Sequence, residues 1–412
     1  MESIPPQTQP KIPIAIALRV FLPFAFGYFL SYLYRAVNAV IAPDLMAELG
    51  LGGSALGFLT AAYFLTFAAF QLPLGILLDR YGPRRVEAGL LIFAALGAAL
   101  FAAAESVQSL ILARALIGFG VSACLMASFK AFVMWFPLNR LPLINGFQMT
   151  AGGLGALTAT APVEMALGVT DWRGVFWILA GVTAFAAVVI YFVVPERDAG
   201  NRHSTLNEAF QGVVDVFKSP LFWAVAPWTV MSQATFLALQ GLWVGPWFMD
   251  VIGLDRHATA QNLFWIAASM ILGFLSWGIA SDRLHKKWGI RPMTVAAVGL
   301  SLCMTSLLLI TFQASAFPLG VWMVFGFCGT SGILPYAALS QSFPVHLAGR
   351  VNTSLNLLVF VMAFLVQWLV GAVLDLWPTQ GAGVYAAAGY QTAFALLLIA
   401  QVLGAAWYFK RR

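Results

Sequence analysis

The chain has 412 residues, of which 61% are hydrophobic and 9% are charged, and its formal net charge is +6. A soluble globular domain carries about 25% charged residues, so this composition excludes a soluble fold and predicts a protein whose solvent is lipid. Runs of roughly 20 apolar residues indicate membrane-spanning helices, whereas a barrel would show alternating strands of about ten. The basic residues fall at the ends of these runs, where membrane orientation explains them, so nucleic acid is not an expected partner.

Twelve apolar runs are long enough to span a bilayer, which predicts an all-α membrane protein with two pseudo-symmetric six-helix bundles. The expected spans are 14–42, 54–77, 86–104, 108–134, 143–163, 174–194, 221–248, 259–280, 291–312, 317–340, 351–376 and 386–408. The longest polar interruption predicts an N-terminal bundle over 1–195, a linker over 196–219 and a C-terminal bundle over 220–412. Within the linker, 205–218 is expected to form an amphipathic helix on the inner membrane surface, with Thr205 and Glu208 as a capping box.

Lysine and arginine are distributed very unevenly between the two sides of the membrane. With the N-terminus inside, seventeen of the 22 basic residues lie on the cytoplasmic side, two lie in outer loops and three lie within spans. Loops rich in these residues stay in the cytoplasm. Both termini are therefore predicted to face the cytoplasm from a plasma membrane, which is the inner membrane if the source is bacterial.

A charged turn occurs once in each half of the chain. The first copy, between the second and third spans, reads Gly75-Ile-Leu-Leu-Asp79-Arg80-Tyr-Gly82-Pro-Arg84-Arg85. A weaker copy contains Asp282 and Arg283, and Asp282 lies 203 positions after Asp79. Such a duplication indicates two related six-helix halves, and it favours transport by rocking of the halves about a site near the membrane midplane.

The first copy of this turn resembles the signature of the major facilitator superfamily. Span four adds Leu110-x-x-x-Arg114-x-x-x-Gly118-x-Gly120, which is similar to the second motif of that superfamily. The resemblance implies the twelve-helix fold of the family and a path lined by spans one, four, seven and ten. It also implies that Asp79 contacts the N-terminus of span eleven and latches the halves when the cavity faces outward. The other expected gating residues are Gly75, Arg80, Gly82, Arg84, Arg85, Asp282 and Arg283.

Span five is rich in glycine from Gly146 to Gly155. It lacks the Gly-Pro pair that proton-driven drug exporters of the superfamily carry in this span. The difference argues against drug–proton antiport.

The end of span one gives the strongest indication of the substrate. Tyr32-x-x-Arg35 resembles the organophosphate and anion–cation symporter branches, in which this arginine belongs to the anion site, so the resemblance implies that role for Arg35. Tyr28, Tyr32 and Arg35 share one helical stripe, which places aromatic walls beside a cationic fork suited to a carboxylate. The alternative is that Arg35 extends toward the membrane surface while the aromatic residues pack. Span seven lacks the second arginine of phosphate-ester exchangers, which favours a monoanion or a weakly charged solute over a phosphate ester.

Seven further residues within the spans are candidates for substrate contact: Arg114, Gln233, Gln240, Trp243, Phe325, Tyr336 and Asn356. For Arg114 the alternative is a packing role, paired with backbone carbonyls. Gly329, Gly332 and Pro335 would allow span ten to bend, as the broken helices of transporters do. Lys130 is expected to extend to the inner membrane interface.

The sixteen acidic residues all fall outside the middle of the expected spans. Glu87 is placed at the flank of span three, as one partner for Arg80, Arg84 or Arg85, with the linker as the other. Glu164, at the outer end of span five, is then the best remaining candidate for a proton relay. A path with two arginines and no buried acid favours an anionic solute, which either brings its own proton or is carried by an exchange or uniport cycle.

Together these observations predict a secondary transporter, such as a symporter, that moves a small carboxylate-like organic anion by alternating access. The alternatives are drug or metabolite efflux by proton antiport and a transporter-like solute sensor. An enzyme, a cofactor and a metal site are not expected, because the sequence offers no nucleophile–base set, phosphate loop or metal-ligand cluster. The expected partners are the small-molecule solute, protons and the lipid bilayer, and the protein is expected to be a monomer.

Overall fold

The structure is a computed structural model that describes residues 13–137, 140–197, 206–314, 316–344, 347–378 and 384–411. Its regular elements in these ranges are all helices. They are α1 (Ile14–Ala36), α2 (Asn38–Leu49), α3 (Gly53–Ala102), α4 (Val107–Gly120), α5 (Cys124–Trp135), α6 (Leu141–Thr158), α7 (Ala161–Leu167), α8 (Trp172–Val193), α9 (Leu206–Lys218), α10 (Pro220–Ala238), α11 (Val244–Asp250), α12 (Arg256–Trp288), α13 (Pro292–Thr311), α14 (Pro318–Gly329), α15 (Leu334–Gln341), α16 (Ala348–Leu374) and α17 (Ala387–Arg411). A π-helical turn, Leu239–Trp243, joins α10 to α11, and a 3-10 turn, Thr330–Ile333, joins α14 to α15.

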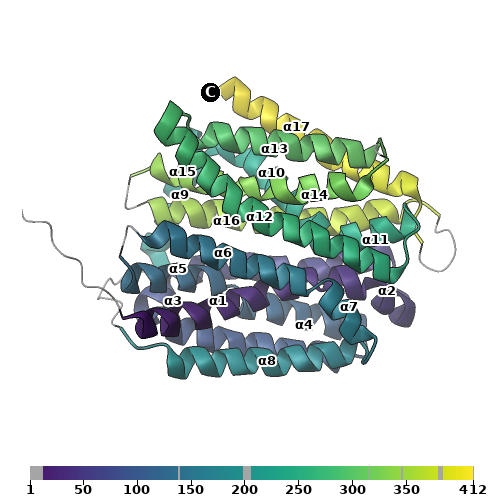
Figure 1. Cartoon of the computed structure of the whole chain (residues 1–412), viewed down its shortest axis with the longest axis horizontal. Helices are drawn as coiled ribbons and strands as arrows, with labels where there is room; N and C mark the ends of the chain where they lie inside the picture. Colours follow the sequence, from purple (N-terminus) through teal and green to yellow (C-terminus); the bar gives the residue numbers. More distant parts are fainter. Residues whose placement is uncertain are drawn as a thin grey trace, which may run out of the picture.

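The expected twelve membrane spans are present. By length and composition, ten helical segments of the described chain are long and apolar enough to cross a membrane. One of them, α3, contains two spans joined at a sharp bend, and α6 with α7 supplies the span that remains. The helices form two bundles, α1–α8 and α10–α17, which lie side by side in Figure 1. The start of α1 and the end of α17 lie at the same end of the molecule, which we call the termini end; the opposite end is the far end.

The bend inside α3 is made by Gly82. Its φ of 76° and ψ of 160° lie in a region that glycine adopts without steric cost. The bend brings the charged turn to the termini end, where Arg84 and Arg85 both pair with Glu196, at the start of the linker. Of the two partners expected for these arginines, the structure therefore selects the linker. Asp79 pairs with Lys130 of α5, so the expectation that Lys130 extends freely to the interface is wrong.

The linker contains the expected helix, α9, over Leu206–Lys218. Thr205, the first residue of the expected capping box, lies outside the described residues. On the expected membrane face, Phe210 is exposed but Val213 is buried, as is Val216, because α9 packs against α16 and α3. The helix thus lies against the two long helices that bridge the bundles.

The two bundles are joined at the far end by polar contacts. Arg256 of α12 binds both carboxylate oxygens of Asp44 in α2, at 2.8 and 2.6 Å. The Asp375 carboxylate, just after α16, accepts hydrogen bonds from the backbone N–H groups of Gly53 (2.7 Å) and Ser54 (2.8 Å) at the start of α3. A carboxylate is favourable at a helix N-terminus, because the unpaired N–H groups there carry partial positive charge. These contacts hold the far end closed.

We predict that Asp375→Asn opens the far end. The carboxylate contributes about 0.3–1 kcal/mol in an exposed position and up to ~2 kcal/mol when partly buried, so the population should shift roughly 2- to 30-fold. Spin labels on Cys introduced at Val169 and Ile252, exposed positions of opposite bundles, would report a longer distance. Glu105→Gln, an exposed far-end acid, is the control, and an unchanged distance distribution in Asp375→Asn would contradict the latch.

Candidate functional site

A cavity of about 180 Å³ lies between the two bundles, near the middle of the molecule. Its walls come from α1, α3, α5 and α6 of the first bundle and from α10, α12, α15 and α16 of the second. Several of these helices are interrupted at cavity level, since α4 gives way to α5 at 121–123 and α14 to α15 at the 3-10 turn. The expected bend in span ten is therefore present. Such interruptions free backbone groups and space beside a midplane cavity.

Arg35 is the only charged residue among the described residues that line this cavity. Its side chain is 4% exposed, and its Nε atom has no hydrogen-bond partner in the described part of the chain. The guanidinium carbon lies 4.5 Å from the ring centre of Tyr32, 5.2 Å from that of Phe360 and 5.6 Å from that of Phe67. Aromatic faces attract a cation, so an aromatic cage holds Arg35 where no acidic side chain of the described residues pairs with it. The alternative in which Arg35 extends to the membrane surface is not what the structure shows.

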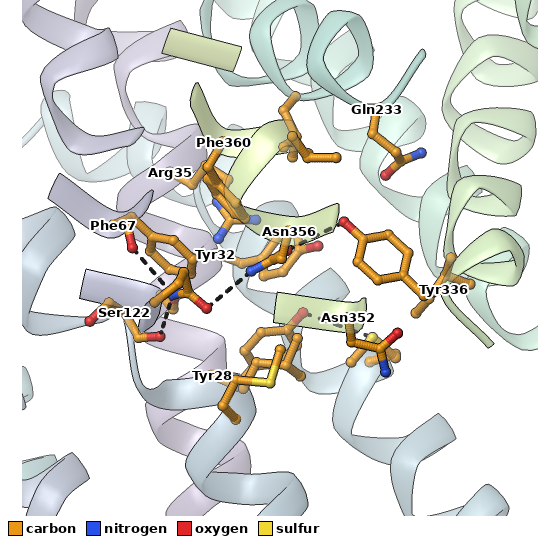
Figure 2. A pocket seen from close by; sticks show the side chains of 18 of the residues that line it. Tyr28, Tyr32, Arg35, Phe67, Ser122, Gln233, Tyr336, Asn352, Asn356 and Phe360 are labelled. Carbon is orange, nitrogen blue, oxygen red and sulfur yellow. Dashed lines mark hydrogen bonds between the residues drawn. The ribbon is translucent and has the colours of Figure 1, made fainter. Parts of the chain in front are cut away.

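A chain of amide and hydroxyl groups crosses the cavity from one bundle to the other. Tyr336 of α15 donates to Oδ1 of Asn356 at 3.3 Å, and Asn356 donates to Oε1 of Gln71 in α3 at 3.2 Å (Figure 2). Gln71 in turn donates to the carbonyl oxygens of Phe67 and Ser122. Asn352, one turn before Asn356, lines the cavity with an Oδ1 atom that has no partner among the described residues. Neutral donors and acceptors thus accompany the single cation.

The glycines of span five bring α6 close to α1. A Cβ at Gly152 would lie 2.6 Å from the Tyr28 ring and 2.9 Å from the Tyr32 ring, and one at Gly155 would overlap the carbonyl oxygen of Phe29. Tyr28 and Tyr32 pack edge to face, with ring centres 5.1 Å apart. The small residues therefore give the two tyrosines room to stand at the cavity wall.

Six of the ten residues expected to bind substrate line the cavity: Tyr28, Tyr32, Arg35, Gln233, Tyr336 and Asn356. The other four, Arg114, Gln240, Trp243 and Phe325, lie outside its lining. Arg114 is fully buried and donates to the carbonyl oxygen of Tyr34 at 2.8 Å, which matches the packing alternative. Trp243 donates to the Gln367 carbonyl oxygen at 3.2 Å, and Phe325 packs on Phe236. Gln240 lies in the π-helical turn beside Thr160.

Several cavity residues were not among those expected from the sequence, and they include Phe67, Gln71, Ser122, Asn352 and Phe360. Gln71 is a lone polar residue inside an apolar run, a signal that could have identified it. Phe67 and Phe360 carry no such signal, because phenylalanine is common in every span of this chain.

The expectation that no acid is buried within the spans is wrong. Glu87 of α3 is 0% exposed, and neither of its carboxyl oxygens has a hydrogen-bond partner among the described residues. Glu164, the acid favoured from the sequence, lies at the far end, 3.2 Å from Nδ1 of His257. Glu87 follows the basic turn so closely that it reads as a flanking residue, but the bend at Gly82 places it inside the bundle.

The cavity continues toward the termini end. A second depression shares Gln71 and Met126 with it, and also contains Asp79, Lys130 and Arg350 at the start of α16. Asp79 therefore lies in one depression with the first turn of α16, the helix end that the resemblance assigns to it. The closed far end and this continuation make the termini end the side from which the cavity is reached.

We predict that Gly152→Ala impairs the site while Gly146→Ala, in the same helix, does not. The Cβ at 152 would press on both tyrosines, and overpacking of this kind typically costs about 1–3 kcal/mol. A Cβ at 146 meets nothing within 4 Å, so its effect should be neutral or stabilising by about 0.5–1 kcal/mol. Thermal unfolding of the purified variants and the KM for solute would separate them, and equal behaviour would contradict this reading.

Comparison with known proteins places the chain among transporters. It is 24% identical over 307 residues to a probable sulfoacetate transporter of Cupriavidus necator, covering 70% of this chain and 71% of that protein. It is 23% identical over 382 residues to a probable L-galactonate transporter of Escherichia coli K12, covering 85% and 81%. A hexuronate transporter of the same organism is 29% identical over 185 residues, covering 44% and 42%.

Solved structures share the fold over nearly the whole chain. A bacterial homolog of the human lysosomal transporter Spinster, inward-facing and unoccupied, has a TM-score of 0.76 at 16% identity, covering 97% of this chain and 98% of that one. The nucleoside transporter NupG has a TM-score of 0.73 at 13% identity, covering 95% and 98%. The sequence profile of the Major Facilitator Superfamily matches residues 24–367. The chain belongs to the Major Facilitator Superfamily and is an integral membrane transporter, not an enzyme.

Proposed function

We propose that this protein transports a small organic monoanion, a carboxylate with polar groups along its body, by alternating access through the central cavity. The single observation that carries the proposal is Arg35, a buried cation in the cavity that has no acidic partner among the described residues. A guanidinium binds a carboxylate through two parallel hydrogen bonds. The bound anion would supply the counter-charge that the cavity lacks.

The polar groups opposite Arg35 define the rest of the proposed solute. Gln71, Asn352, Asn356 and Tyr336 offer both donors and acceptors without adding charge, which suits hydroxyl groups better than a second anion. Two of the relatives support this, because they are named for sugar acids, L-galactonate and hexuronate, which are hydroxylated carboxylates. A third is named for sulfoacetate, a small anion with a second, sulfonate charge and no hydroxyl group.

We further propose that the termini end faces the cytoplasm of a plasma membrane, which would make this conformation inward-facing. The distribution of lysine and arginine supports this orientation, because seventeen of the 22 are assigned to that side. The far-end contacts of Asp44 and Asp375 would then form an outer gate, and Asp79 would engage the first turn of α16 when that gate opens.

We predict that Arg35→Gln strongly reduces carboxylate uptake by proteoliposomes. Hydrogen bonds to a charged group contribute about 1.5–3 kcal/mol, so kcat/KM should fall roughly 10- to 150-fold. The kcat/KM of Arg35→Lys should lie between those of wild type and Arg35→Gln, because lysine keeps the charge but cannot make the two parallel hydrogen bonds of a guanidinium. Lys410→Gln, an exposed charge at the termini end, is the control. The panel should contain galactonate, a hexuronate, sulfoacetate and a neutral sugar; uptake of the sugar alone, or an Arg35→Gln variant with normal kcat/KM, would refute the proposal.

We predict that Asn352→Leu reduces the preference for hydroxylated anions. The Oδ1 atom of Asn352 has no protein partner among the described residues, so it is free to accept a hydrogen bond from a solute hydroxyl. The ratio of KM for galactonate to KM for sulfoacetate should rise roughly 2- to 13-fold, since one hydrogen bond contributes around 0.5–1.5 kcal/mol. Ser340→Ala, a half-buried position on α15 outside the cavity lining, serves as the control. An unchanged ratio would remove Asn352 from solute recognition.

A further inference from the structure

Glu87 is a buried acid, and anion binding at Arg35 does not explain why it is there. It lies in α3, five residues beyond the bend at Gly82, and is 0% exposed. Its carboxyl group fits against Gly27 of α1, where a Cβ would overlap Oε1, and the same position is 3.6 Å from Cδ1 of Ile190 in α8. Only glycine at position 27 leaves this space, so α1 is shaped around the carboxyl group.

The carboxyl group has no counter-charge. Neither oxygen makes a hydrogen bond within the described residues, and the nearby cations are engaged elsewhere. Arg84 and Arg85 pair with Glu196, Arg114 donates to the Tyr34 carbonyl, and the aromatic cage surrounds Arg35. An ionised carboxylate without a partner at such a place is strongly unfavourable, so the group holds a proton in this conformation.

The neighbours of Glu87 connect it to the cavity. On α5 the uncharged Cys124 thiol lies beside the carboxyl group. From α1 and α8 the groups that face it, Gly27 and Ile190, do not titrate. The next residue of α1, Tyr28, lines the cavity, as do Leu125 and Met126, which follow Cys124. Glu87 thus lies against α1 and α5, two helices that line the cavity, and α1 carries Arg35.

Toward the termini end, α3 reaches a partly exposed residue within one turn of Glu87. Arg84, one helical turn earlier in α3, has a side chain that is 22% exposed where it meets Glu196. One turn is about 5.4 Å along the axis, so a small rearrangement of the charged turn would bring water to Glu87.

We propose that Glu87 is the proton carrier that couples transport of the anion to a proton gradient; this rests on the proposed function. Burial against Gly27 requires the proton in the present conformation. In a conformation that admits water, an empty Arg35 favours loss of that proton to the solution, whereas a bound anion neutralises Arg35 and opposes the loss. Anion and proton therefore promote each other's binding, as linkage between two sites requires.

Proteoliposomes loaded with wild type, Glu87→Gln or Glu105→Gln test the proposal with radiolabelled galactonate and sulfoacetate. With one proton per monoanion, a gradient of one pH unit should sustain about tenfold accumulation of galactonate in wild type and in Glu105→Gln. Glu87→Gln should show no accumulation above the level without a gradient, yet should retain counterflow exchange. A Glu87→Gln variant that still responds to the gradient, a wild type that does not, or a folded Glu87→Gln variant without counterflow would each overturn the proposal.

A second measurement is independent of the solute. The infrared C=O band of a protonated carboxylic acid should be present in purified wild type at neutral pH, shift in D₂O, and be missing from Glu87→Gln but not from Glu105→Gln. If no anion is transported in any arm, the proposed function fails, while the infrared result still decides whether Glu87 holds a proton. A spectrum that Glu87→Gln leaves unchanged overturns the proposal.

Discussion

The structure depends on keeping one arginine charged in the centre of a protein that is otherwise almost free of buried charge. Arg35 is held by aromatic faces from α1, α3 and α16, so the cage includes rings of both bundles. An acidic partner would hold the cation more tightly but would compete with an anionic solute. Aromatic rings stabilise the charge without supplying a negative group. The cavity is thereby left with an unbalanced positive charge, which is what an anion carrier needs.

Hydrogen bonds to the backbone of α1 fix the position of Arg35. Arg114 donates to the carbonyl oxygen of Tyr34, the residue before Arg35, and the Tyr63 hydroxyl donates to the Ser31 carbonyl one turn earlier. These contacts pin the end of α1, which stops at Ala36 and continues as α2 from Asn38. Arg114 therefore acts on the site by positioning α1. The arginine of the family's second motif thus supports the first helix in this structure.

The two bundles meet along α3 and α16, and the polar groups of this pair sit at its ends. At the far end, α3 and α16 approach so closely at Gly53 and Gly371 that a Cβ on Gly371 would overlap the Gly53 carbonyl oxygen. Asp375 caps the start of α3 at the same place. At the termini end, Asp79 of α3 shares a depression with the start of α16 but is paired with Lys130. A carboxylate thus lies toward each end of the contact between the two helices. Closing both ends at once would lock the cavity, so the pairing of Asp79 with Lys130 is consistent with an open termini end.

The sequence by itself determined the number of spans, the duplication, the charged turn and the aromatic stripe with Arg35. These follow from composition and helical period, which act over short stretches of chain. It did not determine which residues line the cavity: Trp243 and Phe325 lie outside it, while Gln71 and Phe360 line it. The helices are interrupted at cavity level, so a single helical period does not predict which face of each segment meets the cavity. Glu87 is the clearest case. Beside three arginines it looks like a solvated flank, and only the bend at Gly82, together with the gap left by Gly27, decides that its carboxyl group is enclosed by three other helices.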